Sequence, residues 1–167
     1  VIMTYALEYS IFSGNPHISH FINVLIYIIT ALVLFRLLSE LMIKYRKDFI
    51  FLITLVFIFH PLHTEVVASL KNRDEMIALL SGLISWLFYL KYIDQQKFMH
   101  IIIACLLFLV AIISKLSILP LMFIIPVSIY FFREVRFKYL FFIFISCLIV
   151  FLIGFIVPKI FITGSVH

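Results

Sequence analysis

The stretch FHPLHTEVVASLKNRDE, residues 59–75, separates two long apolar runs and is dense in ionisable side chains. Within seventeen residues it carries two histidines, three acids, one lysine and one arginine. The runs on either side are rich in Ile, Leu and Phe, and Phe alone occurs 20 times in the chain. A chain that avoids charge almost everywhere concentrates it here, so this segment is the first place to look for chemistry.

The composition indicates an integral membrane protein. Of the 167 residues, 65% are apolar and 13% are charged, and the mean hydropathy is +1.25. Soluble domains carry about 25% charged residues, so this chain has too few polar groups to cover a soluble fold. Its apolar runs are continuous rather than alternating, which favours spanning helices over a barrel. We predict an all-α, polytopic membrane protein whose net charge of +5 reflects cytoplasmic basic residues, with no nucleic-acid partner.

Six apolar segments are candidates to cross a bilayer core of about 30 Å. The second is short, and it spans only if it begins near Tyr45 with Arg46 and Lys47 reaching to the interface. Its far end, His60–Pro61, is then expected at or slightly inside the membrane surface. Val1–Phe12 is expected to be an amphipathic interfacial helix. The predicted spans are Ile18–Leu38, Tyr45–Phe59, Met76–Tyr92, Met99–Ser114, Leu116–Phe132, and Tyr139–Val157 ended by Pro158.

The basic residues predict the orientation. If all six segments span, nine Lys and Arg residues fall on one side and four on the other. Because cytoplasmic loops are enriched in Lys and Arg, the side with nine is predicted to be cytoplasmic. Residues 60–75 then face the periplasm or lumen, on the same side as Glu8, His17, His20 and Lys115. We expect these distant residues to converge in space.

The opening stretch itself predicts a short surface helix. Pro61 suits the first position of a helix, and in a helix over Leu62–Asn72 the residues Glu65, Ser69 and Arg73 would share one face. The alternative is an ordinary extramembrane loop, where charge costs little. Against that stands the short preceding helix, which holds His60 near membrane depth, where ionisable residues are costly and tend to be functional.

Two further polar features allow more than one interpretation. The spacing His60-x-x-His63-x-Glu65 is compatible with a Zn²⁺ or Mn²⁺ ligand set, but Pro61 disrupts helical placement and no third histidine follows. A divalent cation shared with other parts of the protein stays open. Lys115 lies between two apolar runs and is either a lysine that extends to the interface or an anion clamp for a lipid phosphate. Asn23, inside a span, is expected to pack against another helix.

Three motifs in order resemble a known family. NPHISHFINVLIY (15–27), FHPLHTEVVASLKNRDEM (59–76) and SKLSILPLMFIIP (114–126) resemble segments of the GT-C glycosyltransferases. The nearest resemblance is to the transmembrane and TPR-repeat O-mannosyltransferases and their bacterial relatives. It implies a partial GT-C transmembrane domain that transfers a sugar, possibly mannose, from a polyprenyl- or dolichyl-phosphate carrier. The acceptor would be a hydroxyl of a protein or glycan at the non-cytoplasmic face.

The resemblance also implies roles for individual residues. His60, His63 and Glu65 would form the catalytic part of the second non-cytoplasmic loop, with Glu65 as its acid. Arg73 and Lys115 would contact the donor phosphate. Further candidates for the site are His20 and Glu75.

The chain departs from the family pattern in two ways. Leu116 replaces the acid that follows the lysine, and the first non-cytoplasmic loop, which carries the proposed catalytic base, would precede Val1. We therefore expect residues 1–167 to be one partial domain that lacks this loop, the first span and a C-terminal part, and that is inactive alone.

Two other functions stay open. A transporter or flippase segment for a lipid-linked or anionic substrate could line a polar path with these charges, and a purely structural membrane subunit is a third reading. For the enzyme, a bacterial inner membrane is the first expectation for its location and the endoplasmic reticulum membrane the second.

Overall fold

The computed structural model describes residues 16–69 and 72–163. Every regular element within these ranges is helical, which confirms the all-α prediction for this part of the chain. The interfacial helix predicted over Val1–Phe12, and Glu8 within it, fall outside the described residues.

The helices follow the predicted segments, with differences at their ends. The first begins at Pro16, whose fixed φ suits the first turn of a helix. The last continues through Pro158, so the prediction that this residue ends it was wrong; apolar membrane helices accommodate proline where neighbouring groups satisfy the freed carbonyl. The elements are α2 (Pro16–Leu41), α3 (Lys47–Ile58), α4 (Pro61–Ala68), α5 (Arg73–Gln95), α6 (Phe98–Ser114), the 3₁₀ turn η2 (Leu116–Ile118), α7 (Leu121–Phe132) and α8 (Phe137–Thr163).

Three helices are long and apolar enough to cross a membrane alone. They are α2 from His17 onward, α5, and the Phe137–Phe155 part of α8. A fourth is possible if α3 and α4, which are bent by 52°, form one broken span. The helix α6 and the segment Leu116–Phe132 are shorter apolar elements, and a helix of their length rises only about 25 Å. The structure therefore supports a membrane protein, whereas the predicted count of six spans is not shown.

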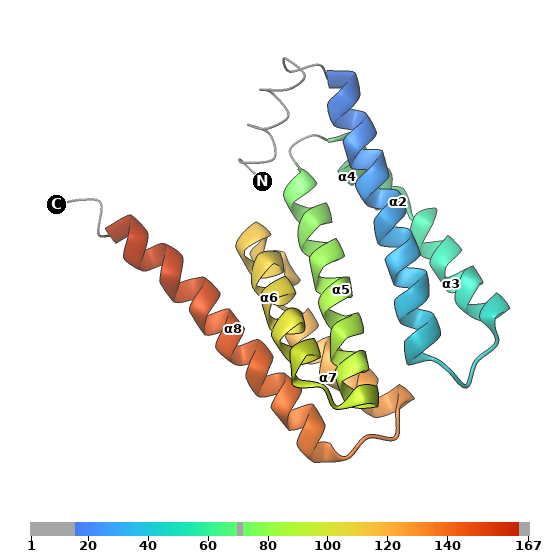
Figure 1. The fold of residues 1–167 in the computed structure, drawn as a ribbon. Helices are drawn as coiled ribbons and strands as arrows, with labels where there is room; N and C mark the ends of the chain where they lie inside the picture. The colour runs from blue at the N-terminus through green and yellow to red at the C-terminus, as the bar shows by residue number, and fades with distance from the viewer. Residues whose placement is uncertain (1–15, 70–71, 164–167) are drawn as a thin grey trace.

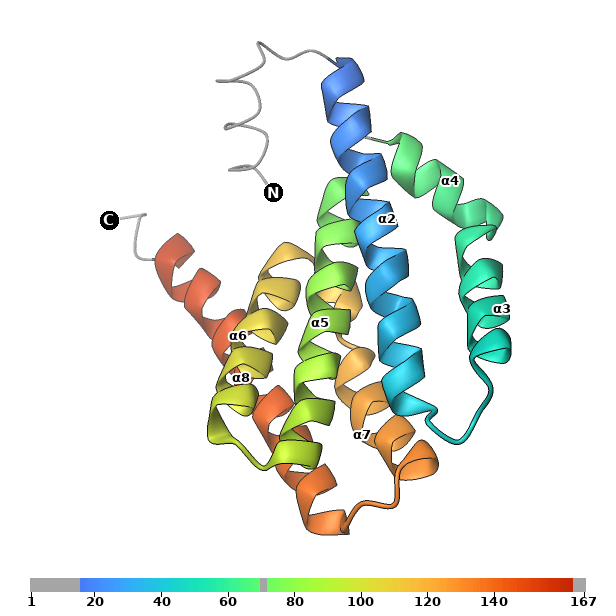
Figure 2. The same ribbon diagram turned by 45° about the vertical axis from the view of Figure 1, so that its right-hand side comes forward.

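The helix α5 forms the centre of the bundle, between α2 and α6 (Figures 1 and 2). Polar side chains connect it to its neighbours. Ser85 Oγ donates to the Ala104 carbonyl at 2.8 Å, and Tyr89 Oη lies 3.0 Å from Ser146 Oγ. Cys147 Sγ also lies 3.4 Å from that phenol oxygen. Hydrogen bonds of this kind hold helices together where no water competes for the polar groups.

Ion pairs join the loops at one end of the bundle. Lys44, after α2, places its Nζ 2.7 Å from Glu134 Oε1, in the α7–α8 loop. Arg133 Nη2 lies 2.8 Å from both carboxylate oxygens of Asp94, near the end of α5. These loops are among those that the sequence predicted to share one side.

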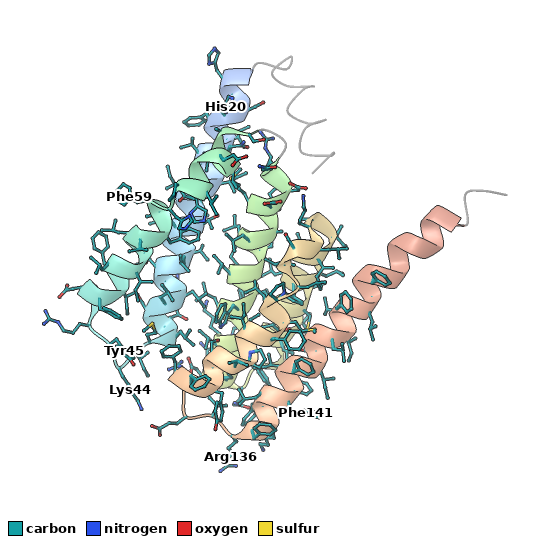
Figure 3. All side chains as sticks on the ribbon, turned by 180° about the vertical axis from the view of Figure 1, so that it is seen from behind. His20, Lys44, Tyr45, Phe59, Arg136 and Phe141 are labelled. Atoms are coloured by element: carbon teal, nitrogen blue, oxygen red, sulfur yellow. The ribbon has the colours of Figure 1, made fainter. Side chains whose placement is uncertain are left out.

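The two ends of the bundle carry different residues. The basic end holds Lys44, Arg133 and Arg136. The site end holds α4, the start of α5 and Lys115. Figure 3 shows His20 at the site end and Lys44 and Arg136 at the basic end, with α2 and α8 running between the ends.

Candidate functional site

A bent helix pair forms one wall of the site end. The ring of His60 caps α4, because its Nδ1 accepts a hydrogen bond from the Leu62 N–H at 3.4 Å. Pro61 follows as the first helical residue, where a missing N–H costs nothing. The helix ends at Ala68, and Ser69 is extended with a ψ of 119°. The predicted surface helix therefore exists but is shorter than expected.

The early end of α4 separates Arg73 from Glu65. We predicted that Glu65, Ser69 and Arg73 share one face of one helix, and this was wrong because Ser69 leaves the helical conformation. Arg73 instead begins α5 and is only 1% exposed, whereas Glu65 is exposed on α4.

The buried guanidinium of Arg73 is held by α2. Its Nε donates to Asn23 Oδ1 at 2.8 Å, and its Nη2 donates to the Ser19 carbonyl at 3.1 Å. Asn23, itself fully buried, donates from Nδ2 toward the carbonyls of Val67 and Ser69 at 3.3 and 3.4 Å. The Asn23 amide therefore accepts a hydrogen bond from a buried charge. It also donates to carbonyls at a helix end that lack partners within the helix. The predicted packing of Asn23 against another helix is confirmed.

Lys115 reaches from the α6–η2 junction to the start of α5. Its Nζ lies 3.0 Å from Asp74 Oδ2 and 3.4 Å from Glu75 Oε1. Hydrogen bonds to Asp74 and then Glu75 raise the pKa of Lys115 above its ordinary value, so the ammonium stays charged at physiological pH. The two acids also suit the first turn of α5, where the helix dipole favours negative charge. The predicted convergence of Lys115 with residues 60–75 is confirmed for these two acids.

A cavity of about 250 Å³ lies beside this ion-pair cluster. Glu75 lines one part of it and His63 another, and the remaining lining is mostly apolar. Side chains from α2, α3, α4, α5 and η2 surround it. A concave, mostly apolar space with a few converging polar groups is the usual form of a small-molecule site.

The orientation of the His63 ring follows from its contacts. Nδ1 lies 2.6 Å from the Phe57 carbonyl oxygen, which can only accept, so Nδ1 carries a hydrogen. The phenol of Tyr27 lies 3.3 Å from the same nitrogen and donates to the Ile58 carbonyl at 2.9 Å. In its neutral form, His63 therefore offers Nε2 as a hydrogen-bond acceptor.

Three other predicted residues do not line this cavity. Glu65 is exposed and makes no side-chain hydrogen bond or ion pair with the described residues. His60, also exposed, caps α4 and does not line the cavity. His20 lines a neighbouring apolar hollow of about 400 Å³, which it shares with Tyr27 and His63.

The described residues do not form a metal site by themselves. Within them, no group of three or more His, Cys, Asp or Glu side chains is arranged to hold a metal ion. The Nδ1 atoms of both His60 and His63 are already used in contacts with the backbone. The His-x-x-His-x-Glu spacing therefore does not fit a metal ion without further ligands.

Sequence reasoning missed two residues of this site. Asp74 makes the shorter contact to Lys115, and Tyr27 holds His63. A signal for Asp74 was present, because acids cluster in the first turn of helices and Asn72 precedes it as a helix cap. No sequence signal identified Tyr27, since an aromatic residue inside an apolar helix is ordinary.

Comparisons with known proteins agree with the resemblance drawn from the motifs. The chain is 31% identical over 94 residues to the human protein O-mannosyl-transferase TMTC1 and, over the same length, to its mouse counterpart. The chain is therefore similar to a segment of protein O-mannosyl-transferases. The similarity covers 56% of this chain, and the chain spans about a tenth of the length of these relatives. No family model matches the chain, and no solved structure does.

The relationship to TMTC1 bears on the predicted class and location. The apolar helices support a membrane protein, and both matched relatives are named as protein O-mannosyl-transferases. Both relatives are mammalian, so the bacterial inner membrane, which the sequence favoured first, gains no support.

Proposed function

We propose that this chain forms one wall of the active site of a membrane glycosyltransferase. The enzyme would transfer a sugar, mannose by analogy with TMTC1, from a lipid-phosphate carrier to an acceptor hydroxyl of a protein. The observation that carries this proposal is the Lys115 ammonium, which is fixed 3.0 Å from Asp74 at the edge of a cavity lined by Glu75 and His63. The similarity to TMTC1 supports the reaction class.

The charge of Lys115 suits the departing group. In the transfer, the bond between the sugar C1 and the phosphate oxygen breaks, a bond from the acceptor oxygen to C1 forms, and a base takes the hydroxyl proton. The carrier phosphate gains one negative charge as it leaves, and a fixed cation stabilises that charge. An ammonium has three N–H donors, so one remains for a phosphate oxygen when two face Asp74 and Glu75.

The other candidates take supporting roles. Exposed Glu65 would orient the acceptor, and His63 Nε2 would accept a hydrogen bond from a hydroxyl in the cavity. His60 and His20 would shape the rim. We now assign Arg73 to holding the α4–α5 junction instead of the phosphate, because its guanidinium is buried against Asn23. The general base would come from outside the matched segment, whose 94 residues make up 10% of TMTC1.

The site would face the non-cytoplasmic side. The count of nine basic residues against four supports this orientation. It requires that α6 and η2–α7 also cross the membrane, with local thinning of the bilayer compensating for their length.

The test is a transfer assay with the full-length protein in proteoliposomes. Radiolabelled mannose should pass from a dolichyl-phosphate carrier to an acceptor peptide, and the label should become resistant to organic extraction. Movement of the intact labelled carrier between leaflets without transfer would indicate the transporter reading. If neither transfer nor movement occurs, the enzyme proposal is refuted and the structural-subunit reading is supported.

A further inference from the structure

Another hollow lies away from the site end, between α7 and α8. It measures about 450 Å³, and its lining is almost wholly apolar. Five phenylalanines line it, and Tyr130 adds a sixth aromatic ring. The phenylalanines are Phe123, Phe131, Phe137, Phe141 and Phe144, and the remaining lining is Pro126, Val127 and Leu140. Most of these side chains are exposed, and an exposed apolar groove of this kind is suited to a hydrocarbon chain.

This groove continues into a charged hollow at the basic end. The charged hollow measures about 580 Å³ and shares Tyr130 and Phe131 with the apolar groove. The rest of its lining comes largely from the loops that follow α2 and α7. In Figure 3, Arg136 and Phe141 lie at the same end of α8, so the charged and apolar linings meet there.

Among the described residues, one of the three cations that line this hollow has no acidic partner. Lys44, Arg133 and Arg136 line it against a single acid, Glu134. Lys44 pairs with that acid, and Arg133 pairs with Asp94. Arg136 is exposed, and its side chain makes no hydrogen bond or ion pair with the described residues.

We infer that the α7–α8 groove binds an anionic glycerophospholipid, with one acyl chain along the aromatic wall and the phosphate on Arg136. The planar guanidinium binds phosphate oxygens in pairs. Tyrosine favours the headgroup level of a bilayer, and Tyr130 lines both hollows. The groove therefore presents matching chemistry to both parts of one lipid. It is separate from the proposed sugar-transfer site, which lies at the opposite end of the bundle.

The first test measures lipid affinity by native mass spectrometry of the detergent-solubilised full-length protein. Phosphatidylglycerol should bind more tightly than phosphatidylcholine. Arg136→Gln should weaken phosphatidylglycerol binding by about fivefold, as expected for one basic residue at a membrane surface, and should weaken phosphatidylcholine binding less, because choline makes that headgroup neutral overall. The matched control is Lys97→Gln, an exposed cation at the α6 cap outside both hollows, which should change neither affinity. Equal effects of the two variants, or none, would overturn the inference.

The second test locates the lipid. A photoreactive Val127→p-benzoylphenylalanine variant places the probe in the groove, and Ile113→p-benzoylphenylalanine places it on exposed α6. In nanodiscs containing both lipids, the probe at Val127 should capture phosphatidylglycerol preferentially, and the probe at Ile113 should show no preference. Capture of another segment of the protein by the probe at Val127, or equal capture of both lipids, would contradict the inference.

Discussion

Asn23 Oδ1 lies 2.8 Å from Arg73 Nε, and this contact joins α2 to the junction of α4 and α5. Asn23→Ala removes an acceptor from a buried guanidinium and a donor from the last carbonyls of α4. We expect the free energy of unfolding to fall by about 2–3 kcal/mol. The measurement is thermal unfolding of the purified full-length protein in one detergent.

The chain offers a matched control for that substitution. Asn72 lies at the same junction, and its side chain makes no capping hydrogen bond. Asn72→Ala should therefore leave the melting temperature nearly unchanged. Equal melting temperatures for the Asn23 and Asn72 variants would show that Asn23 does not stabilise the α4–α5 junction.

The convergence of the site end was predictable from the sequence, because it needs only the alternation of spans. Lys115 was expected beside the 60–75 segment, and it lies against Asp74 and Glu75. The position of Arg73 was not predictable from spacing. The spacing rule assumed one continuous helix, whereas the chain leaves the helical conformation at Ser69 and starts a new helix at Arg73.

The number of membrane spans was also not predictable from the sequence alone. Hydropathy identifies an apolar helix but not whether its length matches the bilayer. α6 has 17 residues, at the lower limit of about 17–25 for a crossing helix. The cavity was also beyond prediction, because its wall combines side chains of five elements whose packing angles no sequence pattern reveals.

Asp74 should act on the donor only through Lys115. Asp74→Asn removes the shorter of the two carboxylate contacts, so the ammonium should be less well fixed and donor affinity should fall by about threefold to tenfold. In a Lys115→Ala background, the same change should have little additional effect. A double-mutant cycle on the Michaelis constant for the lipid-linked sugar measures this coupling. Additive effects would mean that Asp74 acts independently of Lys115.

The ionisation of Lys115 predicts how donor affinity should depend on pH. Its pKa is raised by its hydrogen bonds to Asp74 and Glu75, so its charge is complete below the ordinary lysine pKa of about 10.4. The charge is lost only as pH rises through the still higher folded value. Lys115 should therefore cause no loss of donor affinity between about pH 6 and 9.

Replacing Lys115 with histidine should make donor affinity depend on pH. In Lys115→His, the positive charge should be lost as pH rises through about 6.5. Donor affinity should therefore be weaker above that pH than below it. The measurement is donor affinity of both proteins across this range. A Lys115→His variant with flat pH dependence would contradict the role of charge at this position.

Gly82 allows α5 to approach the segment that carries Lys115. A Cβ at this position would lie 2.7 Å from Leu121 Cδ1 and 3.2 Å from Ile118 Cγ1. Gly82→Ala should be mild, because the end of the Leu121 side chain can move. Gly82→Val should lower the free energy of unfolding by about 1–3 kcal/mol and displace η2. Thermal unfolding of the two variants tests the contact, and a Val variant as stable as the parent protein would refute it.

The central claim is that Lys115 binds the phosphate of a lipid-linked sugar donor at the site end. The direct measurement is donor affinity and turnover of the full-length protein with Lys115→Ala, compared with Lys97→Ala at the basic end. We predict that Lys115→Ala weakens donor affinity by about tenfold or more, as expected for loss of a charged hydrogen bond, and that Lys97→Ala changes neither quantity. Donor affinity and turnover that are the same in Lys115→Ala as in the parent enzyme would contradict the claim.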